Sequence, residues 1–175
     1  MMQHLLLMIV VILCSACARV PSQPQAELTY HGIERKNNAI YTIRYSSDMD
    51  LLNVFSRAEG EGQLATMLIC SLDGDPVFSA EHVIENKFEG VIGISGKTPG
   101  PPFAFETEGT LNVTHNGGTS SKLLSKNDLQ HLLHARQEVV CKAFITAFGY
   151  KAYYSKSMLI PSADIIREVD KDLRN

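Results

Sequence analysis

The run QLATMLICSL, residues 63–72, decides the fold of this chain. Its apolar side chains are too continuous for a strand with one solvent-exposed face. We therefore predict a central β-strand, buried on both faces, that carries Cys70 into the core. The turn-forming residues Asp73-Gly74-Asp75-Pro76 end the strand.

Segments with alternating polar and apolar residues lie on both sides of this run. In residues 39–45, Tyr41, Ile43 and Tyr45 would form the apolar face of a strand, joined by a turn at 36–38 to the strand before it. Glycines in a later segment indicate a bulge or a close approach of two backbones. The predicted additional strands cover residues 27–33, 39–45, 77–84, 88–95, 103–113, 138–148 and 150–160.

Three segments have helical spacing instead. Ser47 would cap a short helix over residues 48–60, and Ser125 with Asp128 forms a capping-box pattern before a leucine stripe. Pro161-Ser162 would begin a closing helix with Ile165 and Val169 on its buried side. Strands joined by short turns, with helices inserted between them, predict an α+β fold. We expect mainly an antiparallel β-sheet or sandwich with two to three packed helices.

The N-terminus, MMQHLLLMIVVILCSAC, has an apolar core of nine residues, Leu5–Leu13, and its first charged side chain is Arg19. This core is shorter than the roughly 20 residues that span a bilayer. Small residues followed by Cys17 resemble a bacterial lipoprotein signal, and this resemblance covers only the signal and the residues just after it. It implies cleavage before Cys17 and a diacylglycerol on that sulfur.

Two alternatives to lipidation remain. Ala16-Cys17-Ala18 also fits ordinary signal peptidase, which would release a secreted or soluble periplasmic protein beginning at Arg19, and the segment could also be retained. On the lipoprotein interpretation, residues 1–16 are the signal peptide and residues 17–26 are the lipidated cysteine and an extended, proline-containing tether. Residues 27–175 then form a single β-rich domain.

The chain has four cysteines, Cys14, Cys17, Cys70 and Cys141. Lipoprotein processing removes the first and acylates the second, which leaves Cys70 and Cys141 in an oxidising compartment. A disulfide between them is the simplest prediction, and two separate buried thiols are the alternative.

Composition excludes several classes of partner. The 16 basic and 19 acidic side chains are interspersed, with a formal net charge of −3, so the chain has neither a basic stripe for nucleic acid nor a polybasic membrane patch. The absence of tryptophan also leaves few stacking platforms for single-stranded nucleic acid. We expect no nucleic-acid partner.

One group of side chains has metal-ligand character. Asp128, His131 and His134 follow one another at helical spacing and could hold a transition metal if a fourth ligand came from elsewhere. The alternative, which we favour, is a solvated helix face. The chain has no G-x-S-x-G motif, and bridged cysteines cannot act as thiolates. We therefore predict no catalytic residue and no cofactor.

These observations favour a membrane-anchored envelope lipoprotein with a non-catalytic, protein-binding role, such as an accessory or assembly factor of an envelope complex. Two alternatives are an inhibitor or immunity protein that inserts its 97–102 loop into a hydrolase, and a hydrolase with an unrecognised site around His131 and His134. Ala18 is not the Asp that follows the lipidated cysteine in inner-membrane retention signals, so we expect an outer-membrane anchor facing the periplasm.

Overall fold

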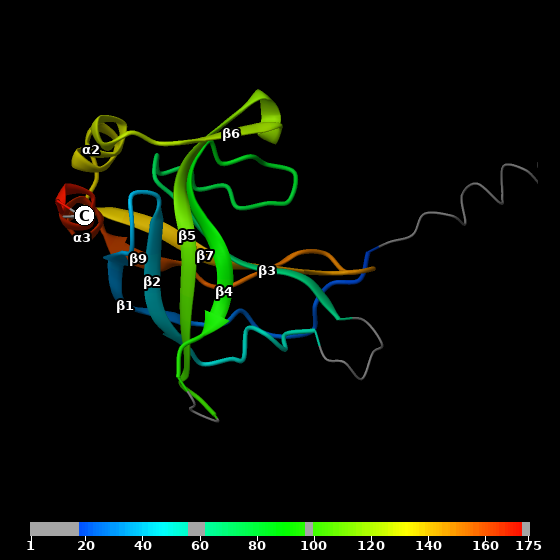
Figure 1. Ribbon diagram of the computed structural model, residues 1–175. Coiled ribbons are helices and arrows are strands. Elements are labelled where there is room, and N and C mark those ends of the chain that lie inside the picture. The colour runs from blue at the N-terminus through cyan, green and yellow to red at the C-terminus, as the bar shows by residue number, and fades with distance from the viewer. Residues whose placement is uncertain (1–17, 56–61, 97–99, 173–175) are drawn as a thin grey trace, which may run out of the picture.

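The computed structural model describes residues 18–55, 62–96 and 100–172. In these residues the chain forms one sheet and two α-helices, and all strand pairs within the sheet are antiparallel (Figure 1). The elements are β1 (Leu28–Arg35), β2 (Ile40–Ser47), β3 (Gln63–Ser71), β4 (Asn86–Ile94), β5 (Phe103–His115), the 3₁₀ turn η2 (Asn116–Gly118), β6 (Ser120–Leu123), α2 (Lys126–His134), β7 (Glu138–Ala147), β8 (Tyr153–Tyr154), β9 (Met158–Pro161) and α3 (Ser162–Asp170). The predicted α+β class is confirmed.

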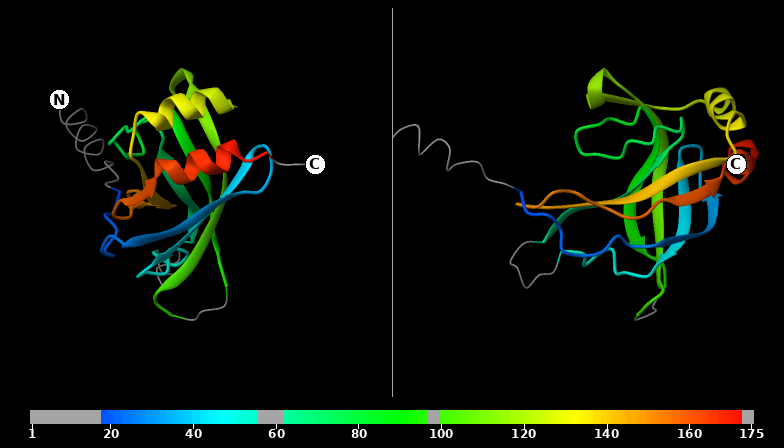
Figure 2. Two further views of the ribbon diagram at one scale, coloured as in Figure 1. Left: turned by 90° about the vertical axis from the view of Figure 1, so that its left-hand side faces the viewer. Right: turned by 180° about the vertical axis from the view of Figure 1, so that it is seen from behind.

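The sheet curls strongly around its core. Its order is β1-β2-β5-β4-β3-β7-β8, with β9 also paired to β7 and β6 paired to β5. The curl brings β9 close to β1, and α3 lies over the seam between them (Figure 2). Both helices lie at one end of the curled sheet, while the segment that begins at residue 18 and the end of β7 lie at the other (Figures 1 and 2).

The concave face of the sheet holds the core, as the alternation predicts. Tyr41, Ile43 and Tyr45 of β2 are all buried, and the turn at 36–38 joins β1 to β2. Neighbouring strands add inward-facing side chains at every second position. Outside β2, the fully buried large side chains are Leu51, Leu68, Leu72, Phe88, Phe105, Leu133, Val139, Ile145, Met158 and Ile160.

The central strand β3 differs from its prediction in one respect. It lies in the middle of the sheet between β4 and β7, and Leu68 and Cys70 are buried. The other face is not covered: Met67 and Ile69 are only partly buried, and Leu64, beside a register shift, is exposed. An antiparallel sheet can leave one face toward solvent, so a continuous apolar run does not require burial on both faces.

Helix α2 begins as predicted. The Ser125 hydroxyl accepts a hydrogen bond from the Asp128 backbone N–H at 3.2 Å, and the Asp128 carboxylate accepts one from the Ser125 N–H at 3.3 Å. Helix α3 buries Ile165 and Val169 as predicted. Ser162, however, does not cap it: the side chain is buried without a hydrogen-bond partner among the described residues.

The predicted helix over residues 48–60 is wrong in the part that the structure describes, residues 48–55, where the chain forms turns. The Asp50 side chain takes a backbone N–H group that a helix would use, whereas the Ser47 hydroxyl makes a bond that a helix cap would also make. Ser47 accepts from the Met49 N–H at 3.1 Å, and Asp50 accepts from the Leu52 N–H at 3.0 Å. Such local bonds compete with helix formation. Residues 56–60 lie outside the described residues.

The predicted strand over residues 77–84 is also wrong. Residues 72–85 form an irregular connection from β3 to β4. The Asp75 carboxylate accepts from the Val77 N–H at 2.9 Å, and Asp73 accepts from both the backbone and the side-chain N–H groups of Asn86, at 3.2 and 3.0 Å. These turns fold the connection over the convex face, and Asn86, predicted as a turn residue, begins β4 instead.

The last predicted strand, residues 150–160, is split into β8 and β9. Ser155 lies between them, and its hydroxyl accepts a hydrogen bond from the Ala143 backbone N–H at 2.9 Å. The Ser155 hydroxyl thus accepts a β7 N–H hydrogen bond in place of a backbone carbonyl. The turn before β8 is at Gly149 as predicted, with a φ of 77° that favours glycine.

Residues 18–26, predicted to be an extended tether, contain no helix or strand beyond the bridge at Arg19 and lie against the domain. The Tyr153 hydroxyl donates to the Pro24 carbonyl at 2.8 Å and accepts from the Ala26 N–H at 2.5 Å. Ala26 is fully buried, and its carbonyl accepts from the Lys156 N–H at 2.9 Å. The part of the tether that the structure describes is therefore fastened to the domain.

Candidate functional site

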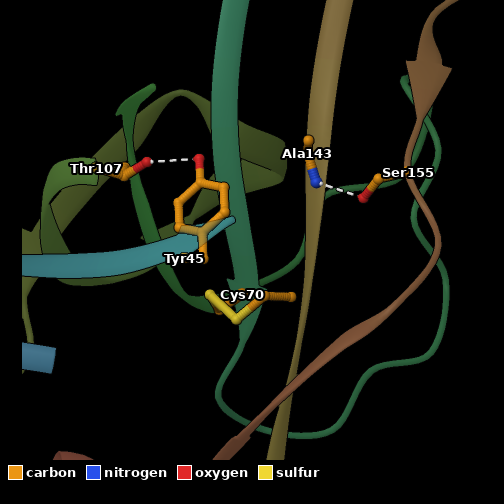
Figure 3. The surroundings of a disulfide bond; sticks show 6 residues. Tyr45, Cys70, Thr107, Ala143 and Ser155 are labelled. Atoms are coloured by element: carbon orange, nitrogen blue, oxygen red, sulfur yellow. Dashed lines mark hydrogen bonds between the residues drawn. A yellow bond between two sulfur atoms is a disulfide. The ribbon is translucent and has the colours of Figure 1, made fainter. Parts of the chain in front are cut away.

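The predicted disulfide is confirmed. Cys70 on β3 and Cys141 on β7 are directly opposite in the strand register, and their sulfur atoms are bonded at 2.05 Å (Figure 3). Both cysteines are buried, so the bridge belongs to the core. It has a structural role in this position, since neither sulfur is available as a thiolate.

The polar groups around the bridge are paired with one another. Tyr45, whose ring lies near the disulfide, shares a hydrogen bond of 3.0 Å with the Thr107 hydroxyl (Figure 3). Burial raises the pKa of Tyr45 far above its usual value, so this phenol stays neutral. On the other side, Ser155 contacts the backbone of Ala143. Tyr45, Thr107 and Ser155 therefore have hydrogen-bond partners within the core.

The candidate metal ligands on α2 do not form a metal site. Asp128 serves the helix cap, and its hydrogen bonds from Ser125 lower the pKa of its carboxyl. His131 and His134 are exposed. An open depression of about 310 Å³ beside Asp128 and His131 is lined by no other His, Cys, Asp or Glu side chain. In the parts of the chain that the structure describes, no three His, Cys, Asp or Glu side chains are grouped to hold a metal ion.

The convex face of the sheet carries a row of apolar side chains that the sequence analysis missed. Met67 of β3 is directly opposite Val91 of β4 and Phe144 of β7, and Phe144 is opposite Tyr154 of β8. Directly opposed residues point to the same face of a sheet. We call Val91, Met67, Phe144 and Tyr154 the outer stripe. Val91 is 69 % exposed, and the other three are partly buried.

A small cavity adjoins the outer stripe, under the 72–85 connection. Its volume is about 200 Å³, and Phe144 and Tyr154 of the stripe line it together with Ile69, Phe78 and Val83. The Phe144 and Tyr154 rings are 5.3 Å apart, centre to centre. Ligand pockets for small molecules usually exceed about 300 Å³, so this cavity suits a single inserted side chain better.

The apolar run of β3 does indicate this surface, but we interpreted the run as a strand buried on both faces. The residues of β3 that would have been the second buried face are Met67 and Ile69, which instead form part of the convex surface. An apolar run can mean burial on two faces or one buried face and one apolar surface. Only the strand neighbours and the position of the helices decide between these two arrangements.

Several sequence predictions fall outside the described residues. Cys17 and the signal peptide precede residue 18, and residues 97–99 of the 97–102 loop are likewise outside. Of the helices that the structure does describe, none combines the length and the apolar character that crossing a membrane requires.

Comparisons of the chain with protein-family models, with curated proteins and with solved structures find no match.

Proposed function

We propose that the protein is a lipid-anchored envelope lipoprotein that binds another envelope protein through the outer stripe and has no catalytic role. The observation that carries this proposal is the row Val91-Met67-Phe144-Tyr154, in cross-strand register on the convex face. Phe144 and Tyr154 pack under the 72–85 connection, but Val91 is 69 % exposed and Met67 beside it is only partly buried, so the row reaches the surface at its β4 end. Contiguous exposed apolar side chains are typical of interaction sites.

The chemistry of the stripe favours a protein partner. Aromatic side chains such as Phe144 and Tyr154 are enriched among the residues that dominate binding energy, and methionine adapts to irregular partner surfaces. The adjoining cavity of about 200 Å³ offers a socket for one partner side chain. Beyond Val91, the row continues to Glu108 of β5, which is exposed and would supply a polar rim.

Crosslinking tests the stripe directly. A photoreactive amino acid at Val91 in intact cells should give one discrete adduct, because Val91 would be buried in the complex. Leu159 of β9 is the matched control, since it is also an exposed apolar strand residue, at 46 %, but lies away from the stripe. Val91→Glu should reduce co-purification of the crosslinked protein about tenfold or more, since each loss of about 1.4 kcal/mol is a factor of ten, whereas Leu159→Glu should not. Equal adducts from both positions, or unchanged co-purification of the Val91→Glu protein, would contradict the proposal.

The anchor needs its own test. The intact mass of protein extracted from the membrane fraction should correspond to cleavage before Cys17, one diacylglycerol modification and one disulfide. Cys17→Ala should leave the protein unlipidated and out of the outer-membrane fraction. A soluble product that begins at Arg19 would instead support secretion.

A further inference from the structure

The chain enters the domain at one defined point. The Arg19 N–H donates to the Gly149 carbonyl at 2.9 Å, the Lys151 N–H donates to the Arg19 carbonyl at 2.8 Å, and Arg19 forms a parallel bridge with Tyr150. Position 17 is two residues before this bridge, so extended chain separates the two by at most about 7 Å. A lipid joined to the chain just ahead of Arg19 would therefore be attached near the turn between β7 and β8.

Three large apolar side chains are exposed at this same end of the molecule. Phe148 follows the last residue of β7, Leu64 lies in β3 beside the pair Gln63–Ala147, and Val20 follows Arg19. Their exposed fractions, 73, 71 and 70 %, are the largest among the large apolar side chains of the described residues. We call Val20, Leu64 and Phe148 the apolar tip. Figures 1 and 2 show the three segments together, far from α2 and α3.

We propose that the apolar tip inserts into the bilayer that holds the lipid anchor. This inference rests on the proposed lipidation of Cys17, because the anchor places the membrane within reach of the tip. Transfer of Phe, Leu and Val side chains from water into the acyl boundary is favourable, and the exposed Lys151, which directly follows Tyr150 of the Arg19 bridge, would add attraction to anionic headgroups.

Insertion would fix the orientation of the domain. A flexible tether would let the domain turn freely, but the described part of residues 17–26 is hydrogen-bonded to β8 and to the residues just before and after it. With the lipid and the tip both in the bilayer, the helices α2 and α3 point away from it. The outer stripe, on the side of the sheet, then stays available to a partner in the same membrane.

Tryptophan fluorescence provides the test, because the chain contains no tryptophan of its own. Phe148→Trp places a single reporter in the tip, and Leu64→Trp places a second one in case the first variant folds poorly. Val91→Trp is the matched control, since Val91 is 69 % exposed but belongs to the outer stripe. Each protein is expressed as the full chain, purified from membranes and reconstituted in phosphatidylethanolamine–phosphatidylglycerol vesicles with and without brominated acyl chains.

The expected result is a blue-shifted emission that brominated lipid quenches strongly in the Phe148→Trp and Leu64→Trp proteins and weakly in the Val91→Trp protein. If all three proteins float with the vesicles but are quenched equally weakly, the tip does not insert, and the proposed lipid anchor is still supported. Strong quenching of the Val91→Trp protein to the same extent would show a different orientation and overturn the inference. If the proteins do not float at all, the anchor fails and this inference fails with it.

Discussion

Gly90 and Gly109 are directly opposite each other on β4 and β5, and both are buried. A Cβ atom at either position would overlap the carbonyl oxygen of the other strand, that of Glu108 or of Glu89. At Gly109 it would also lie 2.7 Å from the Phe88 ring, which occupies the space above the glycine. Gly90, Gly93 and Gly96 predicted a bulge or a close approach of two backbones, and at Gly90 the close approach is what forms.

Gly109→Ala should therefore lower the free energy of unfolding by about 1–3 kcal/mol, the usual cost of overpacking a core. Gly32→Ala is the matched control, because Gly32 also lies in a strand but has no atom within 4 Å of the place that an alanine methyl group would take. That variant should stay within about 0.5 kcal/mol of the parent. Urea denaturation of the two variants measures both values. Equal stability of the two would mean that β4 and β5 separate easily at this point.

At the scale of elements, α3 closes the seam of the curled sheet through a buried carboxylate. Glu168 is 2 % exposed, and it accepts hydrogen bonds from the Arg35 backbone N–H of β1 at 3.0 Å and from Lys171 at 2.6 Å. Burial by itself would raise the pKa of Glu168, but the bonds from Lys171 and Arg35 and the charge of Arg167 outweigh it and lower the pKa below its ordinary value of 4.5.

A lowered pKa in the folded state makes stability depend on acid. Because the unfolded chain binds the proton more readily, the contribution of Glu168 is fully present above about pH 4.5 and is lost as the pH falls through the lower, folded-state pKa. Glu168→Gln should be less stable by about 1.5–3 kcal/mol at pH 7, and its unfolding curve should converge with that of the parent in acid. Denaturation at a series of pH values measures the difference.

Lys171→Met is a second variant for the same point, since it removes one partner and keeps the carboxylate. It should flatten the acid dependence and destabilise the protein at neutral pH, because a buried carboxylate then has one charged partner fewer. A constant gap between the Glu168→Gln protein and the parent at all pH values would contradict this account of α3.

The elements that the sequence predicted well are those in which pattern and local chemistry agree. The alternation of Tyr41, Ile43 and Tyr45 correctly predicted the buried face of β2. Ser125 with Asp128 correctly predicted the first turn of α2. Where the predictions were wrong, side chains bound the backbone locally. Asp50 and Asp75 take N–H groups that a helix or a strand would use, and alternation alone does not report such competition.

The candidate site was harder to predict than the fold. The Cys70–Cys141 pair followed from counting cysteines, since only two remained for the domain. The outer stripe depends on which strands are neighbours: Met67, Val91 and Phe144 come from three strands whose order the sequence does not encode locally. The apolar tip depends likewise on the pairing of Arg19 with Tyr150, which joins segments far apart in the sequence.

For the molecule as a whole, the disulfide is a covalent bond between two neighbouring strands of the curled sheet. It connects β3 to β7 and closes a loop with a sequence separation of 71 residues that contains β4, β5, β6 and α2. In the folded state these strands are already neighbours through their hydrogen bonds. The bridge therefore acts mainly by restricting the unfolded chain, which a loop of this length should do by roughly 4 kcal/mol.

The paired substitution Cys70→Ala and Cys141→Ala should consequently keep the fold and lose about 4 kcal/mol of unfolding free energy, with some further loss from the space left by two buried sulfurs. Circular dichroism should show the same strand content in both proteins, and guanidinium denaturation should show the loss. The control is dithiothreitol, which should destabilise the parent by a similar amount and leave the alanine variant unchanged, because only the parent has a bond to reduce. If reduction abolished the strand signal in the absence of denaturant, the β3–β7 pairing would depend on the bridge itself. Packing and hydrogen bonds alone would then not maintain the curled sheet.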